Sequence, residues 1–408
     1  MGGSKYKNVN PVTIKNILTL RYNPVKKTLL PKLTWKDFKE KQIGDSTNFI
    51  EKSIEDYIRN EIGYSKKKIS IALSGGIDST LILAILRKTL PHIEIDAISI
   101  SFAESIDESR KAAKIAEKFE ANHHIVFIEN YLEELPKEIS IIKLPFWDLH
   151  WYHVVKKAKS LSHPLISGDG GDELFGGYTF RYEKFLSSIG LKSSTSERMK
   201  AYLECHERDW VPNQEKMFGK KIRFSWNEIY KILEPFFDNP LSPLLQVFLA
   251  DFNGKLLYNW LPNNTKFHDY FGIKAILPFL SKNLISYSTH LPHHLKYNRQ
   301  KNIGKLSLRK ILGKYVSKSF ITDTKQGFSI NTTNLWKSNT SKLCDYYLSE
   351  ARIVKEGWIN KDWIEPHIKK LESDTNVRYV NKFMGLLALE IWFRLFMTKE
   401  IKSDSLLN

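Results

Sequence analysis

The segment KISIALSGGIDSTLILAIL, residues 68–86, joins an apolar run to a helical pattern through two adjacent glycines. KISIA is typical of a buried strand, and the residues from Asp78 onward have the apolar spacing of a helix. Gly75 and Gly76 allow the backbone to come very close to another molecule. The N–H groups and positive partial charge at the start of the following helix predict an anion site at this turn.

The polar side chains of the turn suit a phosphate with a bound metal. Ser74 and Ser79 add hydroxyl donors. Asp78 would repel a phosphate by itself, but Mg²⁺ binds carboxylate and phosphate oxygens together. The GxxxxGK[ST] pattern of a Walker A loop is absent. Because short motifs of this kind also occur in ordinary strand-to-helix turns, this loop alone leaves the function open.

Strand and helix patterns continue on both sides of the turn. They predict helices at 46–62, 106–121 and 148–161, and strands at 94–102, 123–128 and 163–168. This alternation predicts an α/β fold, a doubly wound and mainly parallel sheet that binds ligands beyond the carboxyl ends of its strands. Strand signals fade after residue 190. We therefore expect an N-terminal extension over 1–45, an α/β core over 46–190 and a largely helical C-terminal part over 191–408.

A second glycine-rich loop follows the predicted strand at 163–168. LISGDGGDELFGGY, residues 165–178, holds five glycines and three carboxylates. Because the carboxyl ends of parallel strands meet at one edge of a sheet, Asp172 is expected to face Asp78 across the crevice. These two carboxylates would be available for magnesium, and Asp169 and Glu173 would remain to act on a substrate.

Composition narrows the class of protein. The 408 residues are 42% hydrophobic and carry a formal net charge of +17, which indicates a globular chain that is compatible with polyanionic partners. Cys205 and Cys344 lie far apart, which argues against a disulfide framework or a cysteine zinc site. The apolar segment around Glu390 and Arg394 predicts a buried helix, not a membrane span. The N-terminus lacks a secretory pattern, so a cytoplasmic protein is expected.

The two loops carry a resemblance to a known family. LSGGIDS (73–79) resembles the pyrophosphate loop of the N-type ATP pyrophosphatases, and SGDGGDELFGGY (167–178) narrows the resemblance to the asparagine synthetase family, in its glutamine-dependent branch. The other similar segments, in chain order, are 106–126, LPFL (277–280), GKLSLRKIL (304–312) and TKQGFS (324–329). The likeness covers about residues 46–335 and implies an adenine nucleotide alpha hydrolase-like, Rossmann-like fold.

The resemblance implies how ATP and magnesium would bind. The nucleotide-binding positions that it indicates are Leu73, Ser74, Gly75, Gly76, Asp78, Ser79, Ile100, Ser167 and Gly168. Leu73, Ser74 and Ile100 would lie near the adenosine, and Gly75, Gly76 and Ser79 would contact the phosphates. Asp78 and Asp172 would bind Mg²⁺.

The resemblance also implies a reaction in two steps. A substrate carboxylate, the aspartate side chain in the family, attacks the α-phosphorus of ATP and releases pyrophosphate. Ammonia or another amine then displaces AMP from the acyl-adenylate and forms the amide. Lys305 and Lys325 would neutralise the charge that develops on the pyrophosphate. Asp169 or Glu173 would orient or deprotonate the amine.

The chain departs from the family pattern at its start. Full-length members begin with a glutaminase domain whose nucleophile is a cysteine next to the first methionine, whereas position 2 here is Gly2 and the first cysteine is Cys205. ILTLRYNPVKKTLL (17–30) resembles the connection between the two domains of those members. The nitrogen donor is therefore open between free ammonia, a separate glutaminase subunit and an amine on the substrate itself.

A second departure concerns the acyl-acceptor side. The family usually has LPDD where this sequence has LPNN, so Asn263 and Asn264 stand in place of an acidic pair. The divergent segment spans 261–281 and leaves the identity of the carboxylate substrate open. Lys266 or Asp269 replacing the missing charges is one hypothesis.

Other functions stay under consideration beside an asparagine-forming ligase. The altered 261–281 segment favours a tailoring enzyme that resembles β-lactam synthetases or peptide cyclases. A tRNA-modifying ATP pyrophosphatase would use the same first loop and suit the positive charge, but GDGGDELFGGY is foreign to those families. A non-enzymatic scaffold is disfavoured because the aspartates and lysines of the motifs are present. Nucleic acid and membrane partners are not expected, and a homodimer is one oligomeric state that the sequence leaves open.

Overall fold

The computed structural model describes residues 9–25, 27–44, 46–103, 105, 109–161, 163–190, 192–206, 210–321 and 330–407. Its centre is a five-stranded parallel sheet with the strand order β3-β2-β1-β4-β5. The strands are β1 (Lys68–Ala72), β2 (Glu94–Phe102), β3 (Asn122–Ile128), β4 (Leu165–Ile166) and β5 (Ala275–Ile276). The predicted α/β fold with a parallel sheet is therefore confirmed.

Strands β1 and β2 are largely buried, as expected for parallel strands that lie between two layers of helices. The edge strand β3 alternates instead, and its Ile125 and Phe127 are 50% and 63% exposed. Strand β1 lies between β2 and β4, with Ile71 opposite Ile166. The two glycine-rich loops therefore leave neighbouring strands at the same edge of the sheet.

Strand β5 is absent from the sequence-based prediction. It belongs to the divergent segment and pairs with β4, with Leu165 opposite Ala275 and Ile166 opposite Ile276. A strand of two residues is too short to produce a periodic signal. The late part of the chain thus adds the last strand to the sheet that the first part begins.

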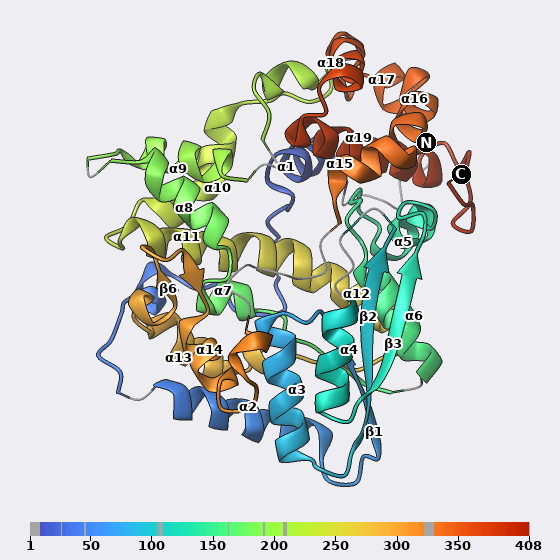
Figure 1. The fold of residues 1–408 in the computed structure, drawn as a ribbon. Helices are drawn as coiled ribbons and strands as arrows, with labels where there is room; N and C mark the ends of the chain where they lie inside the picture. The colour runs from blue at the N-terminus through green and yellow to red at the C-terminus, as the bar shows by residue number, and fades with distance from the viewer. Residues whose placement is uncertain are drawn as a thin grey trace.

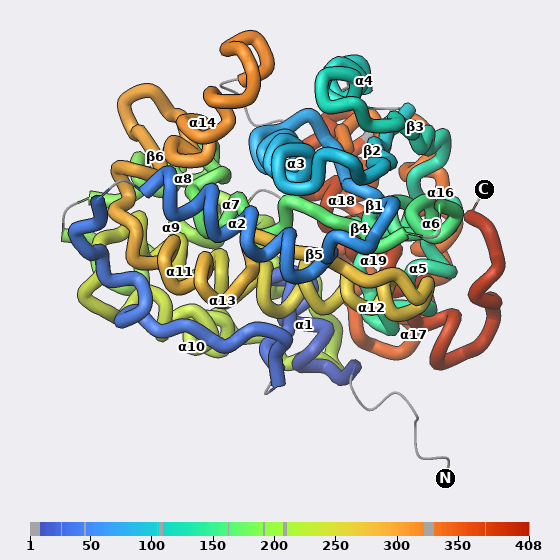
Figure 2. The backbone as a smooth tube through the Cα atoms, turned by 90° about the horizontal axis from the view of Figure 1, so that it is seen from below, coloured from blue at the N-terminus to red at the C-terminus, as the bar shows by residue number. Residues whose placement is uncertain are grey.

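Helices cover both faces of the sheet, and Figure 2 shows α3 and α4 on one side of the strands with α5 and α6 on the other. The helices of this part are α2 (Ser46–Ile62), α3 (Ile77–Thr89), α4 (Ser109–Lys118), α5 (Leu135–Ile142) and α6 (Trp151–Leu161). All except α5 correspond to predicted helices. Most of α3 is buried, because α2 and α14 pack against it.

The middle of the chain is helical, and its larger part forms the left side of the molecule in Figure 1. Its helices are α7 (Gly171–Phe175), α8 (Thr179–Ser188), α9 (Thr195–Glu204), α10 (Trp226–Phe237), α11 (Pro243–Asp251), α12 (Leu261–Phe271), α13 (Lys282–His290) and α14 (Leu306–Leu312). A π-helical segment, η3 (Phe252–Trp260), joins α11 to α12. A small antiparallel hairpin, β6 (Tyr297–Asn298) and β7 (Ile303–Gly304), precedes α14.

Short helical turns complete this part of the chain and its connections. They are η1 (Trp35–Phe38), η2 (Gln214–Met217), η4 (Pro278–Leu280), η5 (His293–Leu295) and η6 (Lys318–Phe320). The last of them precedes the segment 322–329, which lies outside the described residues.

The C-terminal helices, orange and red in Figure 1, lie where the arrowheads of β2 and β3 point. They are α15 (Thr332–Leu335), η7 (Trp336–Thr340), α16 (Ser341–Ser349), α17 (Arg352–Lys355), α18 (Lys361–Ser373) and α19 (Val377–Phe396). Buried Glu390 accepts hydrogen bonds from the N–H groups of Arg352 and Ile353 and pairs with Arg394. This explains a carboxylate in an apolar helix. No helix in the described part of the chain is long and apolar enough to cross a membrane.

The N-terminal helix α1 (Pro11–Leu20) packs against α19. Asn10 caps it, and most of its residues are buried. Its C-terminal end is bound by Lys382, which donates to the carbonyl of Leu18, and by Gln214, which donates to Thr19 Oγ1 over 2.7 Å. The segment that the sequence suggested as an extension is therefore anchored to the C-terminal helix by polar contacts inside the protein.

Candidate active site

The first loop has the backbone shape that an anion site needs. Gly75 has φ = +71°, a left-handed conformation that favours glycine. Gly76 is the cap of α3, so the N–H groups of the first helical turn, which have no acceptor within the helix, lie at the end of β1. Ser74 and Ser79 bring their hydroxyl oxygens to 3.2 Å from each other, and Ser79 Oγ accepts from the N–H of Ser74 over 3.2 Å. The loop therefore gathers backbone and hydroxyl donors at one point.

The second loop needs its glycines because Asp78 and Asp172 occupy the space beside it. A Cβ on Gly168 would lie 2.8 Å from Asp78 Cβ, and one on Gly171 would lie 2.6 Å from Asp78 Cγ. A Cβ on Gly177 would overlap the Asp172 carboxylate. These three positions are closer than real Cβ contacts allow. The glycines of the second motif therefore let the two loops approach and place the two carboxylates side by side.

Lys305 joins the two loops. It precedes α14 and adopts φ = +58°, and its Nζ forms ion pairs with Asp78 and with Asp172, the latter over 2.7 Å. Burial opposes the charge of Lys305, but the two carboxylates raise its pKa above the usual value. Three predicted site residues from distant parts of the chain thus meet at the edge between β1 and β4.

Two neighbouring carboxylates at the phosphate loop fit the ligand chemistry of Mg²⁺, which combines one or two carboxylates with substrate phosphates and water. A single ammonium group contacts both carboxylates, which shows that one cation can reach them together. The described residues contain no group of three or more His, Cys, Asp or Glu side chains that could hold a metal without a substrate. The residues therefore fit a magnesium ion that arrives with a nucleotide.

Asp169 and Glu173 have different surroundings although both lie in the second loop. Ser167 donates to Asp169 Oδ2 over 3.0 Å, and the indole N–H of Trp260 donates to Oδ1 over 2.9 Å. The Tyr178 hydroxyl donates to Glu173 Oε1 over 2.6 Å. Burial, followed by the charge of Asp172, raises the pKa of Glu173 to about 7.

Glu173 is connected through Tyr178 to a group of buried polar residues in the helical part of the chain. The guanidinium of Arg181 lies 3.6 Å from the centre of the Tyr178 ring, and Arg181 pairs with buried Asp251 over 3.2 Å. Tyr202 donates to the same carboxylate over 3.0 Å. Asp169 is therefore bound from the side of Trp260, whereas Glu173 is fixed by a buried network that serves the fold.

The remaining predicted positions have definite places. Leu73 is buried, its N–H donates to Ile98, and its carbonyl accepts from Ser99 over 2.6 Å. Ile100 is buried in β2. Ser167 is buried and its N–H donates to Ile276 over 3.1 Å. These residues lie buried at the edge of the sheet where the sequence analysis expects the nucleotide. Lys325 lies outside the described residues.

Lys111 is a candidate that the sequence analysis missed. It lies in the first turn of α4, and its Cγ and Cδ are 3.6 Å from the position of a Cβ on Gly75. A cation beside the left-handed glycine is well placed for phosphate oxygens. Nothing in the local pattern distinguished it from the other lysines, because its role depends on where α4 packs.

The divergent segment 261–281 is bound into the fold by hydrogen bonds of Asn263 and Lys266 and by an ion pair between Lys274 and Glu61 over 2.8 Å. Asn263 donates to Asn259 over 2.9 Å, and Asn259 donates to the carbonyl of Arg21 over 2.7 Å. Lys266 donates to the carbonyl of Ile142, at the end of α5, and burial lowers its pKa to about 8. Lys266 thus binds the carboxyl end of α5, and its suggested replacement of a missing family charge stays a hypothesis.

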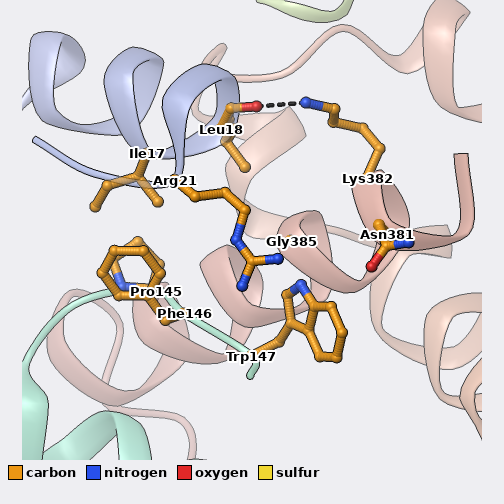
Figure 3. Close-up of a pocket in the computed structure, with 9 residues that line it drawn as sticks. All are labelled: Ile17, Leu18, Arg21, Pro145, Phe146, Trp147, Asn381, Lys382 and Gly385. Carbon is orange, nitrogen blue, oxygen red and sulfur yellow. Dashed lines mark hydrogen bonds between the residues drawn. The ribbon is translucent and has the colours of Figure 1, made fainter. Parts of the chain in front are cut away.

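A pocket lies next to these contacts, between α1, residues 145–147 and α19 (Figure 3). Arg21 extends toward the Trp147 ring, 5.5 Å from its centre, and pairs with Asp148. Lys382 closes another side through its bond to Leu18. Arg21 and Lys382, the cations that line this pocket, are bound to acceptor groups of the protein. The pocket therefore marks the contact between α1 and the loop before α6.

Comparison with known proteins identifies the family of this chain and several relatives. The model of the family described as "Asparagine synthase" matches residues 50–394. Asparagine synthetase [glutamine-hydrolyzing] 1 of Bacillus subtilis is 22% identical over 97% of this chain and 64% of its own length. Putative asparagine synthetase [glutamine-hydrolyzing] 2 of Methanocaldococcus jannaschii is 30% identical over 34% of this chain and 27% of its own. The chain thus spans less than two thirds of the length of these relatives.

A solved structure of an NH3-dependent NAD synthetase from Campylobacter jejuni subsp. jejuni is also similar to this chain. The likeness covers 51% of this chain and 93% of that chain, with 18% sequence identity and a TM-score of 0.27.

Proposed function

Because this chain belongs to the asparagine synthase family, we propose that it is an ATP-dependent amide ligase that activates a carboxylate as an acyl-adenylate. The observation that supports this most is the meeting of Asp78, Asp172 and Lys305 between the two glycine-rich loops. This arrangement offers a cation, two metal-binding carboxylates and a helix start at the position expected for a pyrophosphate.

In this mechanism the first loop binds the phosphates through the N–H groups at the start of α3 and the hydroxyls of Ser74 and Ser79. Asp78 and Asp172 would hold Mg²⁺, which supplies positive charge against the phosphate oxygens. Lys305 stays protonated, since the carboxylates raise its pKa. It stabilises the charge that develops on the pyrophosphate when the substrate carboxylate attacks the α-phosphorus. The proposed role of Lys325 is the same.

Asp169 is the stronger candidate for binding the attacking amine. Its carboxylate is held by Ser167 and Trp260, and carboxylate oxygens with two fixed donors keep further lone pairs for an amine. Glu173 is bound to Tyr178 within a buried network. We therefore assign orientation or deprotonation of the amine to Asp169 and support of the loop to Glu173.

Aspartate is the first candidate for the carboxylate, with ammonia from solution or from a separate glutaminase as nitrogen donor. One observation favours a second candidate, amide formation on a different carboxylate. Asn263 and Asn264 are neutral and buried where the family pattern has acids, and Asn263 contacts Asn259. We also propose that residues 46–190 form an α/β core and residues 191–408 a helical part. This division does not distinguish aspartate from a different carboxylate as substrate.

The test is pyrophosphate release from ATP and Mg²⁺ with aspartate, with and without ammonium, followed by analysis of the amide product. Asp78→Ala is the control, because it removes one proposed magnesium ligand. Aspartate-dependent release that the variant loses, with asparagine formed on adding ammonium, would support the first candidate. Release with another carboxylate and none with aspartate would support the second. An absence of release with every carboxylate in a metabolite panel would contradict the ligase assignment.

A further inference from the structure

Trp260 is the only described tryptophan whose indole N–H donates to a carboxylate of the second loop. It is the last residue of the π-helical segment η3 (Phe252–Trp260), and it reaches Asp169 across 91 residues of sequence. π-Helical insertions are rare and occur frequently at functional sites. Here the irregular turn comes directly before the divergent segment and ends at the residue that binds Asp169.

The direction of this hydrogen bond is fixed by packing. The Trp260 ring lies 5.5 Å from the His150 ring and 6.3 Å from the Trp151 ring, centre to centre, in tilted arrangements. A ring held by two neighbours loses the freedom to turn its N–H away. The second donor, the Ser167 hydroxyl, occupies the other oxygen of Asp169. Each oxygen of the carboxylate therefore has one fixed donor.

The chemistry of the donor decides what the contact can do. An indole N–H only donates, so it favours the ionised carboxylate over the neutral acid. Burial raises the pKa of Asp169 above its usual value, while Trp260 and then Ser167 lower it, and the nearby charge of Asp172 raises it. Trp260 thus opposes the effect of burial at the group that would receive an amine.

We propose that Trp260 is a positioning residue that holds the Asp169 carboxylate ionised and in one orientation for the attacking amine. The catalytic consequence rests on the proposed function, since it concerns amide formation. The hydrogen bond between Trp260 and Asp169 can be tested without an assay of the reaction. Its removal is expected to change the second half-reaction and to leave the first, which depends on Asp78, Asp172 and Lys305, intact.

The chain offers a matched control. Trp151 is a neighbouring tryptophan whose indole N–H donates to His268 Nε2 over 3.1 Å. Trp151→Phe and Trp260→Phe delete the same N–H group and the same ring area. Because the Trp151 ring also packs against Trp260, phenylalanine is chosen so that an aromatic ring stays at that contact. Only Trp260→Phe takes a donor from a carboxylate. A difference between the two variants therefore reports the contact with Asp169 and not the loss of packing.

The first measurement is the indole ¹H–¹⁵N resonance of Trp260 as a function of pH, assigned by its disappearance in Trp260→Phe. We expect it to titrate with Asp169 and to lose this titration in Asp169→Asn, while the Trp151 resonance does not respond to that substitution. A Trp260 resonance that is insensitive to Asp169→Asn would overturn the proposal without any assay of activity.

The second measurement separates the half-reactions. In Trp260→Phe, amide formation is expected to fall about tenfold, with its acidic limb moved to higher pH because Asp169 loses a donor that favours its ionised form. Carboxylate-dependent pyrophosphate release should stay within about twofold of the wild type, as should both reactions in Trp151→Phe. Equal effects in the two tryptophan variants would overturn the positioning role. A wild type that releases no pyrophosphate would overturn the proposed function and this role together, yet the indole titration would still report the hydrogen bond.

Discussion

The two sides of the candidate site are built in different ways. On the nucleotide side, short motifs supply glycines and charges, and the backbone of two loops comes together around Asp78, Asp172 and Lys305. On the acceptor side, Trp260 binds Asp169, and contacts through Asn259 link the neighbouring helix to α1. Local sequence therefore encodes the first side, whereas the second depends on side chains that the fold brings together from distant segments.

The strongest test of this comparison is Lys305→Ala. Because the Lys305 ammonium contacts both carboxylates, its loss should leave two like charges facing each other and remove the cation for the pyrophosphate. Pyrophosphate release is expected to fall by about a hundred- to a thousandfold, the range for a preorganised charge-stabilising group. The measurement is the initial rate at saturating ATP and carboxylate.

Lys310→Ala is the matched control, because Lys310 is an exposed lysine on the same helix, α14. Its rate should equal that of the wild type. Similar losses in both variants would mean that the positive charge of the surface, and not the position of Lys305, supports the reaction.

Lys296, whose Cβ lies close to Gly176 of the second loop, predicts a pH dependence of stability. It is 1% exposed, its Nζ has no hydrogen-bond partner among the described residues, and burial lowers its pKa from 10.5 to about 7. Between these values the unfolded chain binds the proton and the folded protein does not, so the free energy of unfolding should rise with pH. The expected rise is about 3 kcal/mol.

Urea unfolding from pH 7 to pH 10 measures this rise, and Lys296→Met should flatten it and stabilise the protein at pH 7. The exposed Lys301 provides the comparison, since Lys301→Met should leave the slope unchanged. A slope that persists in Lys296→Met would assign the pH dependence to other groups.

Gly177→Ala tests whether the second motif needs its glycines for space. A Cβ at this position would overlap the carboxylate of Asp172 and lie 2.6 Å from Lys305 Cε. The expected result is a loss of about 2 kcal/mol in the free energy of unfolding, the cost of overpacking a close contact, together with slower pyrophosphate release.

Gly190→Ala is the control, because nothing lies within 4 Å of a Cβ there. It should change neither stability nor rate. A Gly177→Ala protein with wild-type kinetics would show that the loops can separate without cost and would weaken the steric account of the motif.

The sequence predicted most of the two glycine-rich loops, whereas Lys111, strand β5 and Trp260 were missed because each depends on how distant segments pack together. The strands that form β1 to β4 were predicted because each carries a long apolar run or precedes a glycine motif, and Asp78 and Asp172 were predicted to meet because parallel strands share one edge. Strand β5 was missed because two residues give no period. Trp260 was missed as a site residue, since its bond to Asp169 depends on the π-helical turn.

The smallest expected effect is that of a substitution at Arg21, close to the acceptor side of the candidate site. Arg21 pairs with Asp148 and lies over Trp147, and its carbonyl accepts from Asn259, the neighbour of Trp260. Arg21→Met should cost about 1–2 kcal/mol in the free energy of unfolding, because it removes a charged partner from a largely buried carboxylate. Because loss of the Arg21 side chain loosens the end of α1, it should shift the carbonyl that Asn259 binds. The KM for the carboxylate should therefore rise severalfold, and the KM for ATP should stay unchanged.

Arg110→Met deletes the same charge at an exposed position on α4, next to the nucleotide side. It is expected to change neither stability nor the KM for the carboxylate. If Arg21→Met instead raised the KM for ATP, α1 would support the nucleotide side as well, and the two sides would share one framework. A change confined to the carboxylate would mean that the N-terminal helix supports the acceptor side alone, the side on which the family motif is altered.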